Sequence, residues 1–163
     1  MKNSILFILL LFVSLSLQAQ TKPGTLYHPE ADAHKEIEAN LAEATAAGKN
    51  VILQIGGNWC GWCYRFHDFV EQDATLKAIV AENFVVYHLN YSKENGNKDL
   101  LAKYRFPQRF GFPVFVVLDA EGNQLHTQDS ALLESGKSYD AKKVANFFKA
   151  WTVQALNPES YKD

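Results

Sequence analysis

The chain has 163 residues, of which 47% are hydrophobic and 13% aromatic, which is enough for one well-packed domain and too little for two of ordinary size. The formal net charge is -2, from 18 acidic and 16 basic residues without a basic block, so a nucleic-acid-binding surface is not expected. The expected partners are small molecules or other proteins.

The N-terminus has the pattern of a signal peptide. Lys2 gives a positive start, Ile5–Leu17 is apolar apart from serines, and a small-residue cleavage site ends at Ala19. An uncleaved membrane anchor is the alternative, but the apolar run has 13 residues, fewer than the roughly 20 of a spanning helix. We expect residues 1–19 to be removed and residues 20–163 to form a single domain that is periplasmic or secreted, without stable membrane insertion.

A helix and a buried strand are expected first. Leu26-Tyr27 is expected to form a brief strand, and Pro29 suits the first turn of a helix that Gly48 ends. The apolar stripe of this helix consists of Ala33, Ile37, Leu41 and Ala44. Val51–Ile55 is a nearly continuous apolar run, typical of a strand buried on both faces.

The only two cysteines follow this strand directly. Gly56-Gly57 ends the strand, Cys60 and Cys63 come next, and a helical pattern continues with Phe66, Phe69 and Val70 facing inward. The expected order is therefore strand, tight turn, cysteine, helix.

A second half of the sheet is expected downstream. Asp73 caps a further helix, and Phe84–Tyr91 forms a second buried strand, parallel to the first. After a short helix at Asp99–Tyr104, Val114–Leu118 forms a third buried strand and Gln124–Thr127 returns antiparallel to it.

The last expected element is an amphipathic helix. Asp140 caps it, and its apolar positions are Val144, Phe147, Phe148, Trp151 and Val153.

The cysteine pair has three interpretations: a structural staple, a redox couple or part of a metal site. As a staple, the disulfide would close a loop of only about four residues and stabilise the fold by about 2 kcal/mol. A disulfide that closes a fifteen-residue loop gives about 3 kcal/mol. As a redox couple, Cys60 lies where backbone N–H groups at a helix start stabilise a thiolate, and Cys63 lies almost one turn below it. The redox interpretation is favoured.

Metal binding is the sharpest alternative. Cys60, Cys63 and His67 would share one helix face, and two thiolates with an imidazole can ligate copper or zinc. A structural zinc site usually has four ligands, and no clear fourth ligand is near in sequence. We therefore expect neither a metal nor a cofactor.

The order of elements, with Trp59-Cys60-Gly61-Trp62-Cys63 after a buried strand and Gly111-Phe112-Pro113 before a later one, resembles the thioredoxin family. The chain is similar to exported thiol:disulfide interchange proteins, in particular to the C-terminal thioredoxin-like domain of transmembrane thiol:disulfide reductases. The resemblance covers about residues 27–151 and implies an α/β thioredoxin fold, with a central mixed β-sheet flanked by helices.

The resemblance also implies roles for residues. Cys60 matches the exposed nucleophilic cysteine, Cys63 the buried resolving cysteine, and Pro113 a cis proline that faces the pair. Gln54 stands where the thioredoxins proper have a buried aspartate that helps to move the proton of the second cysteine. His88 stands near the position of a lysine on the next strand, and we hypothesise that it accepts the proton instead.

Other residues are expected to contact the substrate. Gly61 leaves room for a substrate backbone, and the backbone of Phe112, next to Pro113, can pair with an extended substrate. Trp59 and Trp62 are expected to present apolar surface to the substrate beside the sulfur. The alternative is packing in the core, which is favoured for Trp59 and disfavoured for Trp62. The loop at residues 105–111 with Phe112 either shapes a docking surface or packs its aromatic side chains on the core of the domain.

These features together predict an exported thiol:disulfide oxidoreductase with a CxxC dithiol. Its expected partners are protein thiols and disulfides and an unidentified electron donor, with reduction the direction that the resemblance implies. A thioredoxin-fold binding module without catalysis is a further alternative, and the intact cysteine pair argues against it.

Overall fold

The computed structural model describes residues 25–162, so the expected signal peptide lies outside the described residues. The helices are α1 (Ala33–Ala47), α2 (Gly61–Gln72), α3 (Ala74–Asn83), α4 (Lys98–Lys103), α5 (Ala141–Ala150) and α6 (Val153–Leu156). The strands are β1 (Asn50–Gly56), β2 (Phe84–Asn90), β3 (Val114–Leu118), β4 (Gln124–Asp129), β5 (Glu134–Ser135) and β6 (Ser138–Tyr139). Short 3₁₀ helices lie at Pro107–Phe110, Ser130–Leu133 and Pro158–Tyr161.

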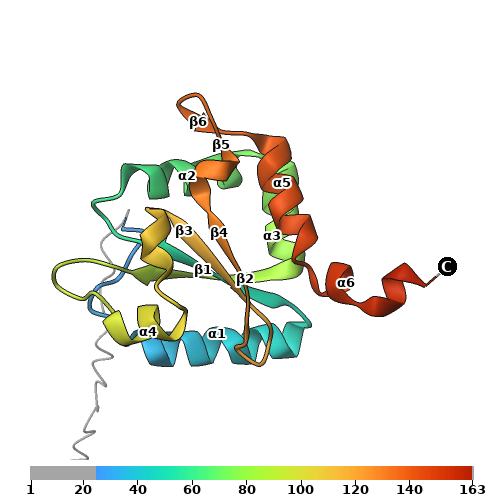
Figure 1. Cartoon of the computed structure of the whole chain (residues 1–163), viewed down its shortest axis with the longest axis horizontal. Coiled ribbons are helices and arrows are strands. Elements are labelled where there is room, and N and C mark those ends of the chain that lie inside the picture. The colour runs from blue at the N-terminus through green and yellow to red at the C-terminus, as the bar shows by residue number, and fades with distance from the viewer. Residues whose placement is uncertain (1–24, 163) are drawn as a thin grey trace, which may run out of the picture.

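A four-stranded mixed sheet forms the centre of the molecule, in the order β2-β1-β3-β4. β1 and β2 are parallel, whereas β3 is antiparallel to both β1 and β4. Helices α1 and α4 lie on one face of the sheet, and α2, α3 and α5 lie on the other (Figure 1). The expected mixed sheet between helices is confirmed.

Alternation along the strands gives each face its own core, because successive side chains of a strand point to opposite faces. Val51, Leu53 and Ile55 of β1 belong to the core under α1 and α4, whereas Ile52 belongs to the core under α2, α3 and α5. By the same alternation Gln54 faces α2. The register pairs Gln54 with His88 of β2, so these two side chains lie side by side beneath α2.

Helix α1 begins later than the sequence suggested. Asp32 is the N-cap, and its carboxylate accepts a hydrogen bond from the Lys35 N–H at 3.3 Å. Pro29 therefore lies in the turn before the helix. The expected end is confirmed, because Gly48 closes α1 in the left-handed conformation.

Two other expectations are wrong. Leu26-Tyr27 is not a strand, because the side chain of Asn58 takes the place of a strand partner: it accepts from the Tyr27 N–H at 3.0 Å and donates to the Tyr27 carbonyl at 2.8 Å. Val153 does not belong to α5, because Thr152 caps the new helix α6. Val153 is 46% exposed.

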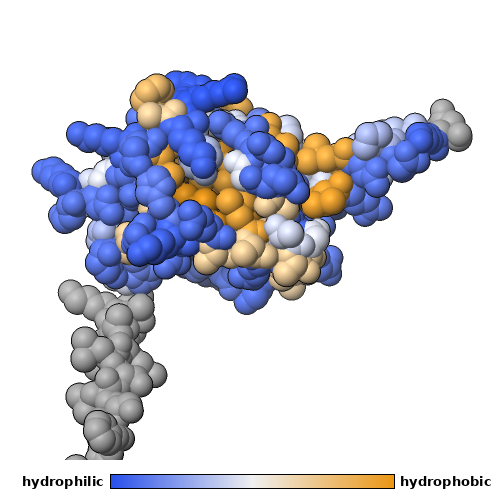
Figure 2. Space-filling model, turned by 90° about the horizontal axis from the view of Figure 1, so that it is seen from below, coloured by the Kyte–Doolittle hydropathy of each residue, from blue (hydrophilic) through white to orange (hydrophobic). Residues whose placement is uncertain are grey.

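The C-terminal segment projects from the body of the molecule. Figure 2 shows apolar surface where it joins the body, and Val153 and Leu156 of α6 line the hollow there. Among residues 25–162, no helix combines the length and the apolar character that crossing a bilayer requires.

Candidate functional site

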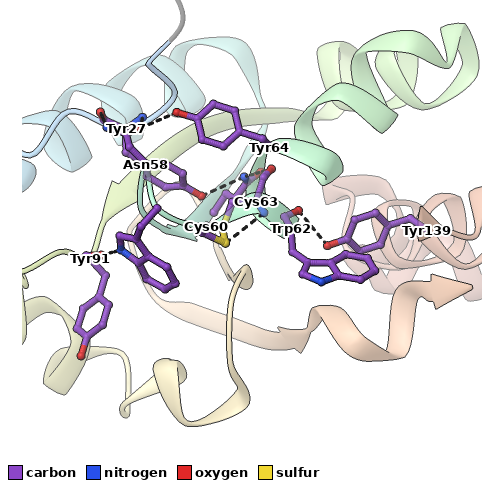
Figure 3. Close-up of a disulfide and its surroundings, with 10 residues drawn as sticks. Tyr27, Asn58, Cys60, Trp62, Cys63, Tyr64, Tyr91 and Tyr139 are labelled. Atoms are coloured by element: carbon purple, nitrogen blue, oxygen red, sulfur yellow. Dashed lines mark hydrogen bonds between the residues drawn. A yellow bond between two sulfur atoms is a disulfide. The ribbon is translucent and has the colours of Figure 1, made fainter. Parts of the chain in front are cut away.

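The cysteine pair lies where β1 gives way to α2. Cys60 is the N-cap of α2, and its sulfur accepts a hydrogen bond from the Cys63 N–H at 3.1 Å (Figure 3). The two cysteines are joined by a disulfide, with Cα atoms 5.3 Å apart. An N–H donor and the positive end of the helix dipole thus both act on the Cys60 sulfur, and both favour its negative form after reduction.

Both cysteines are shielded from solvent in this disulfide form. Cys60 is 4% exposed and Cys63 is 0% exposed. The resemblance implied an exposed Cys60, which is not what the structure shows, although Cys60 remains the more accessible of the two. The pair forms a small cluster with Tyr27, against which Trp62 and Phe112 pack.

The expected cis proline is confirmed. The Phe112-Pro113 peptide bond is cis, and Val114, the next residue, is paired with Ile55 of β1. This pairing brings the segment before β3 to the end of β1 where the cysteines lie. Contact with substrate at Phe112 and Pro113 stays a prediction.

An aromatic surface borders the pair. The Phe112 ring stacks on Tyr91, with centroids 5.0 Å apart, and meets Trp59 edge-on at 5.2 Å. Phe110, in the preceding loop, is 39% exposed, and the Arg109 guanidinium lies over its ring at 4.3 Å. The loop therefore leaves Phe110 on the surface, while Phe112 packs beside the cysteines.

The two tryptophans have the opposite placement to the one expected. Trp59 is 58% exposed, and its indole N–H donates to the Tyr91 carbonyl at 2.8 Å. Trp62 is half-buried, with its ring edge-on to Tyr139 at 5.5 Å and the Arg65 guanidinium 4.5 Å above it. The reason is that Trp59 belongs to the turn before α2, whereas Trp62 lies within the helix and turns toward β6.

Gln54 is buried beneath the pair. It is 3% exposed, and its side-chain N–H donates to the Tyr27 hydroxyl at 3.1 Å and to the Cys63 carbonyl at 3.3 Å. The sequence singled out Gln54 only for the carboxylate it lacks. It gave no signal for Tyr27, because a tyrosine 33 positions before Cys60 in an irregular segment has no pattern that places it at the site.

His88 packs against Tyr27, which contacts the cysteine pair. Its ring meets Tyr27 edge-on at 5.7 Å and His67 at 5.6 Å. Burial, with smaller contributions from the nearby His67 and His28, lowers the pKa of His88 to about 4. His88 is therefore neutral at neutral pH. Its role in proton transfer stays a hypothesis.

A cavity of about 160 Å³ lies beside these histidines. Its walls are mainly apolar, and its polar lining residues are Gln54, His67, Glu71 and His88.

The structure gives no support to the metal alternative. The Cys60 and Cys63 sulfurs are bonded to each other, and the His67 ring lies against His88. Within residues 25–162, no group of three or more His, Cys, Asp or Glu side chains is arranged to hold a metal ion.

Comparison with known proteins agrees with this geometry. A family model described as thioredoxin-like matches residues 32–120. The disulfide bond reductase DsbH of Chlamydia pneumoniae is 30% identical over 78 residues, which cover 43% of this chain and 45% of that protein. The thiol:disulfide interchange protein DsbD of Salmonella typhi is 29% identical over 87 residues, which cover 53% of this chain and 15% of DsbD.

A solved structure shares the fold. The disulphide isomerase of Xylella fastidiosa Temecula1 superimposes with a TM-score of 0.68 at 24% identity, covering 78% of this chain and 97% of that one. The match to the curated relatives spans less than half of their length. The matched region contains β1, the cysteine pair, the cis proline and β3, and on this basis the chain belongs to the thioredoxin-like family.

Proposed function

We propose that this protein is an exported thiol:disulfide oxidoreductase that reduces or exchanges disulfides in protein substrates. The observation that carries the proposal is the Cys60–Cys63 disulfide at the start of α2, with the Cys60 sulfur as N-cap acceptor. Support also comes from the names of the relatives, which include a disulfide bond reductase and a thiol:disulfide interchange protein.

The chemistry runs in two displacement steps. The Cys60 thiolate attacks a substrate disulfide, and one substrate sulfur leaves as a thiolate. The Cys63 thiolate then attacks Cys60 in the mixed disulfide, and the second substrate sulfur leaves. The substrate has gained two electrons and the protein holds the Cys60–Cys63 disulfide, which a separate electron donor must reduce.

The substrate is proposed to bind beside the cysteines along the segment before β3. The backbone of Phe112, next to Pro113, offers hydrogen bonds to an extended chain. Trp59 offers exposed apolar surface, and Trp62 contributes only its outward part. Gly61 leaves open space, since a Cβ added there would meet no atom within 4 Å.

Export is part of the proposal. It is supported by the signal-peptide pattern of residues 1–19, and it would leave residues 20–163 as a single thioredoxin-like domain outside the cytoplasm. N-terminal sequencing of protein recovered from the envelope fraction tests this point. A first residue of Gln20 supports export, and an intact Met1 in the cytoplasmic fraction contradicts it.

Trapping tests the activity. The Cys63→Ser variant is expressed in its native compartment, and mixed disulfides are isolated and identified by mass spectrometry. We expect proteins attached through Cys60, because the variant can attack but cannot resolve. The matched control, Cys60→Ser, should trap few or none. Equal trapping by both variants, or by neither, contradicts the proposed roles.

A further inference from the structure

A buried tyrosine hydroxyl and the sulfur of Cys63 both lie close to Gly56. Tyr27 and Cys63 are both 0% exposed and belong to the same small cluster. A Cβ added to Gly56 would lie 2.4 Å from the Cys63 Sγ and 2.7 Å from the Tyr27 Oη. The sulfur and the hydroxyl oxygen therefore flank the same point at the end of β1.

Gln54 sets the direction of this hydroxyl. Its side-chain N–H donates to the Tyr27 oxygen and also to the Cys63 carbonyl, so it ties Tyr27 to the residue that carries the sulfur. A phenol oxygen that accepts one hydrogen bond still has its own hydrogen for another acceptor. The Cys63 sulfur borders the same point above Gly56, and as a thiolate it becomes a strong acceptor.

Tyr27 has the protonation state that a donor needs. Burial raises the pKa of Tyr27 well above its usual range, so the hydroxyl keeps its hydrogen wherever thiol chemistry runs. A neutral donor stabilises an adjacent thiolate without adding a second negative charge to a buried site. A carboxylate at position 54, in contrast, would add a second negative charge.

We propose that the Tyr27 hydroxyl donates a hydrogen bond to the Cys63 sulfur once the disulfide is opened, and thereby stabilises the thiolate that resolves the mixed disulfide. The role rests on the proposed function. In that step a bond forms between the two cysteine sulfurs, the bond from Cys60 to the substrate breaks, and the departing substrate thiolate takes a proton from solvent. Tyr27 and Gln54 together act in place of the aspartate of the thioredoxins proper.

Other titratable groups surround the site, and the test has to separate them from Tyr27. Tyr64 and His67 come from α2, His88 from β2 and Tyr139 from β6. Their titration affects wild type and variant alike. The informative quantity is therefore the difference between two proteins that differ only in the Tyr27 hydroxyl.

Stopped-flow reaction of the reduced full chain with Ellman's reagent separates the two steps. Attack by Cys60 releases the first equivalent of nitrothiobenzoate, and resolution by Cys63 releases the second. For Tyr27→Phe we expect an unchanged first phase, a second phase slowed about tenfold or more, and a pH midpoint of the second phase raised by about one unit. Tyr104→Phe removes another buried hydroxyl, which lies in the core under α1 and α4, and should change neither phase.

The outcomes distinguish the inference from the function on which it rests. A second phase in Tyr27→Phe with the wild-type rate and pH midpoint overturns the role of Tyr27 and leaves the proposed function standing. A wild-type protein that releases neither equivalent refutes the proposed function itself. If Tyr27→Phe shows no cooperative unfolding, Gln54→Leu takes its place: a second phase slowed severalfold supports the role, and an unchanged one overturns it.

Discussion

Stability should depend on pH through His88. Burial holds the pKa of His88 at about 4, against the usual value of 6.5, so the unfolded chain binds the proton more tightly than the folded one. Above about pH 6.5, His88 does not lower the free energy of unfolding. As the pH falls from there toward 4, the free energy of unfolding decreases. Below about pH 4, His88 causes no further decrease. Linkage gives a loss of about 2 kcal/mol at pH 5 and about 3 kcal/mol once the pH is well below 4.

Urea unfolding of the oxidised protein at pH 8 and pH 5, followed by tryptophan fluorescence, measures this loss. His88→Phe keeps a flat ring between Tyr27 and His67 but cannot take up a proton, so it should lose about 2 kcal/mol less than wild type between the two pH values. Carboxyl groups whose pKa the fold lowers, such as Glu71, contribute equally to both proteins and cancel.

The control changes a histidine at a different place. His126 stacks on Trp151 with centroids 4.5 Å apart, and His126→Phe leaves His88 intact, so it should retain the wild-type dependence on pH. The reasoning is refuted if wild type and His88→Phe lose the same free energy of unfolding between pH 8 and pH 5.

Three further predictions concern packing, exposure and capping. Gly56→Ala should destabilise by about 1–3 kcal/mol in denaturant unfolding, because its Cβ would lie 2.4 Å from the Cys63 sulfur, whereas Gly61→Ala has open space and should not destabilise; equal effects would contradict this packing. Trp59→Ala should raise KM for a disulfide-linked peptide with little loss of stability, while Trp62→Ala should cost about 2 kcal/mol because the half-buried ring packs on Tyr139; the reverse pattern would show that the exposures are misassigned. Asp73→Ala should lower the free energy of unfolding by about 1 kcal/mol, because its carboxylate accepts two N–H groups of α3, and Asp68→Ala, on the exposed face of α2, serves as a control that should change little.

The sheet was predictable because its strands carry apolar runs bounded by turn residues. Val114–Leu118 was placed with its observed bounds, and the parallel pairing of β1 with β2 follows from the helices between them. The start of α1 was missed because Pro29 is compatible with a first helical turn, and sequence alone does not show that Asp32 accepts the capping bond. Local patterns thus gave the elements and left their ends uncertain by several residues.

The site residues that are close together in sequence were predictable. Cys60 and Cys63 are three residues apart, and the resemblance supplied the cis proline. The exposure of Trp59 and the partial burial of Trp62 were missed because they depend on which side of α2 packs against β6, and the local sequence does not show this tertiary contact. Tyr27 was missed because nothing local links a residue before α1 to a sulfur after β1.

Ionisation of Cys60 at the start of α2 is the central claim, and its pKa tests that claim most directly. The reduced protein is alkylated with iodoacetamide over a range of pH, and modification at Cys60 is followed by mass spectrometry. Because the Cys63 N–H and the helix dipole favour a negative sulfur, the rate should reach half its maximum well below the ordinary thiol value of about 8.5, near pH 7. A midpoint above about 9 would contradict the account.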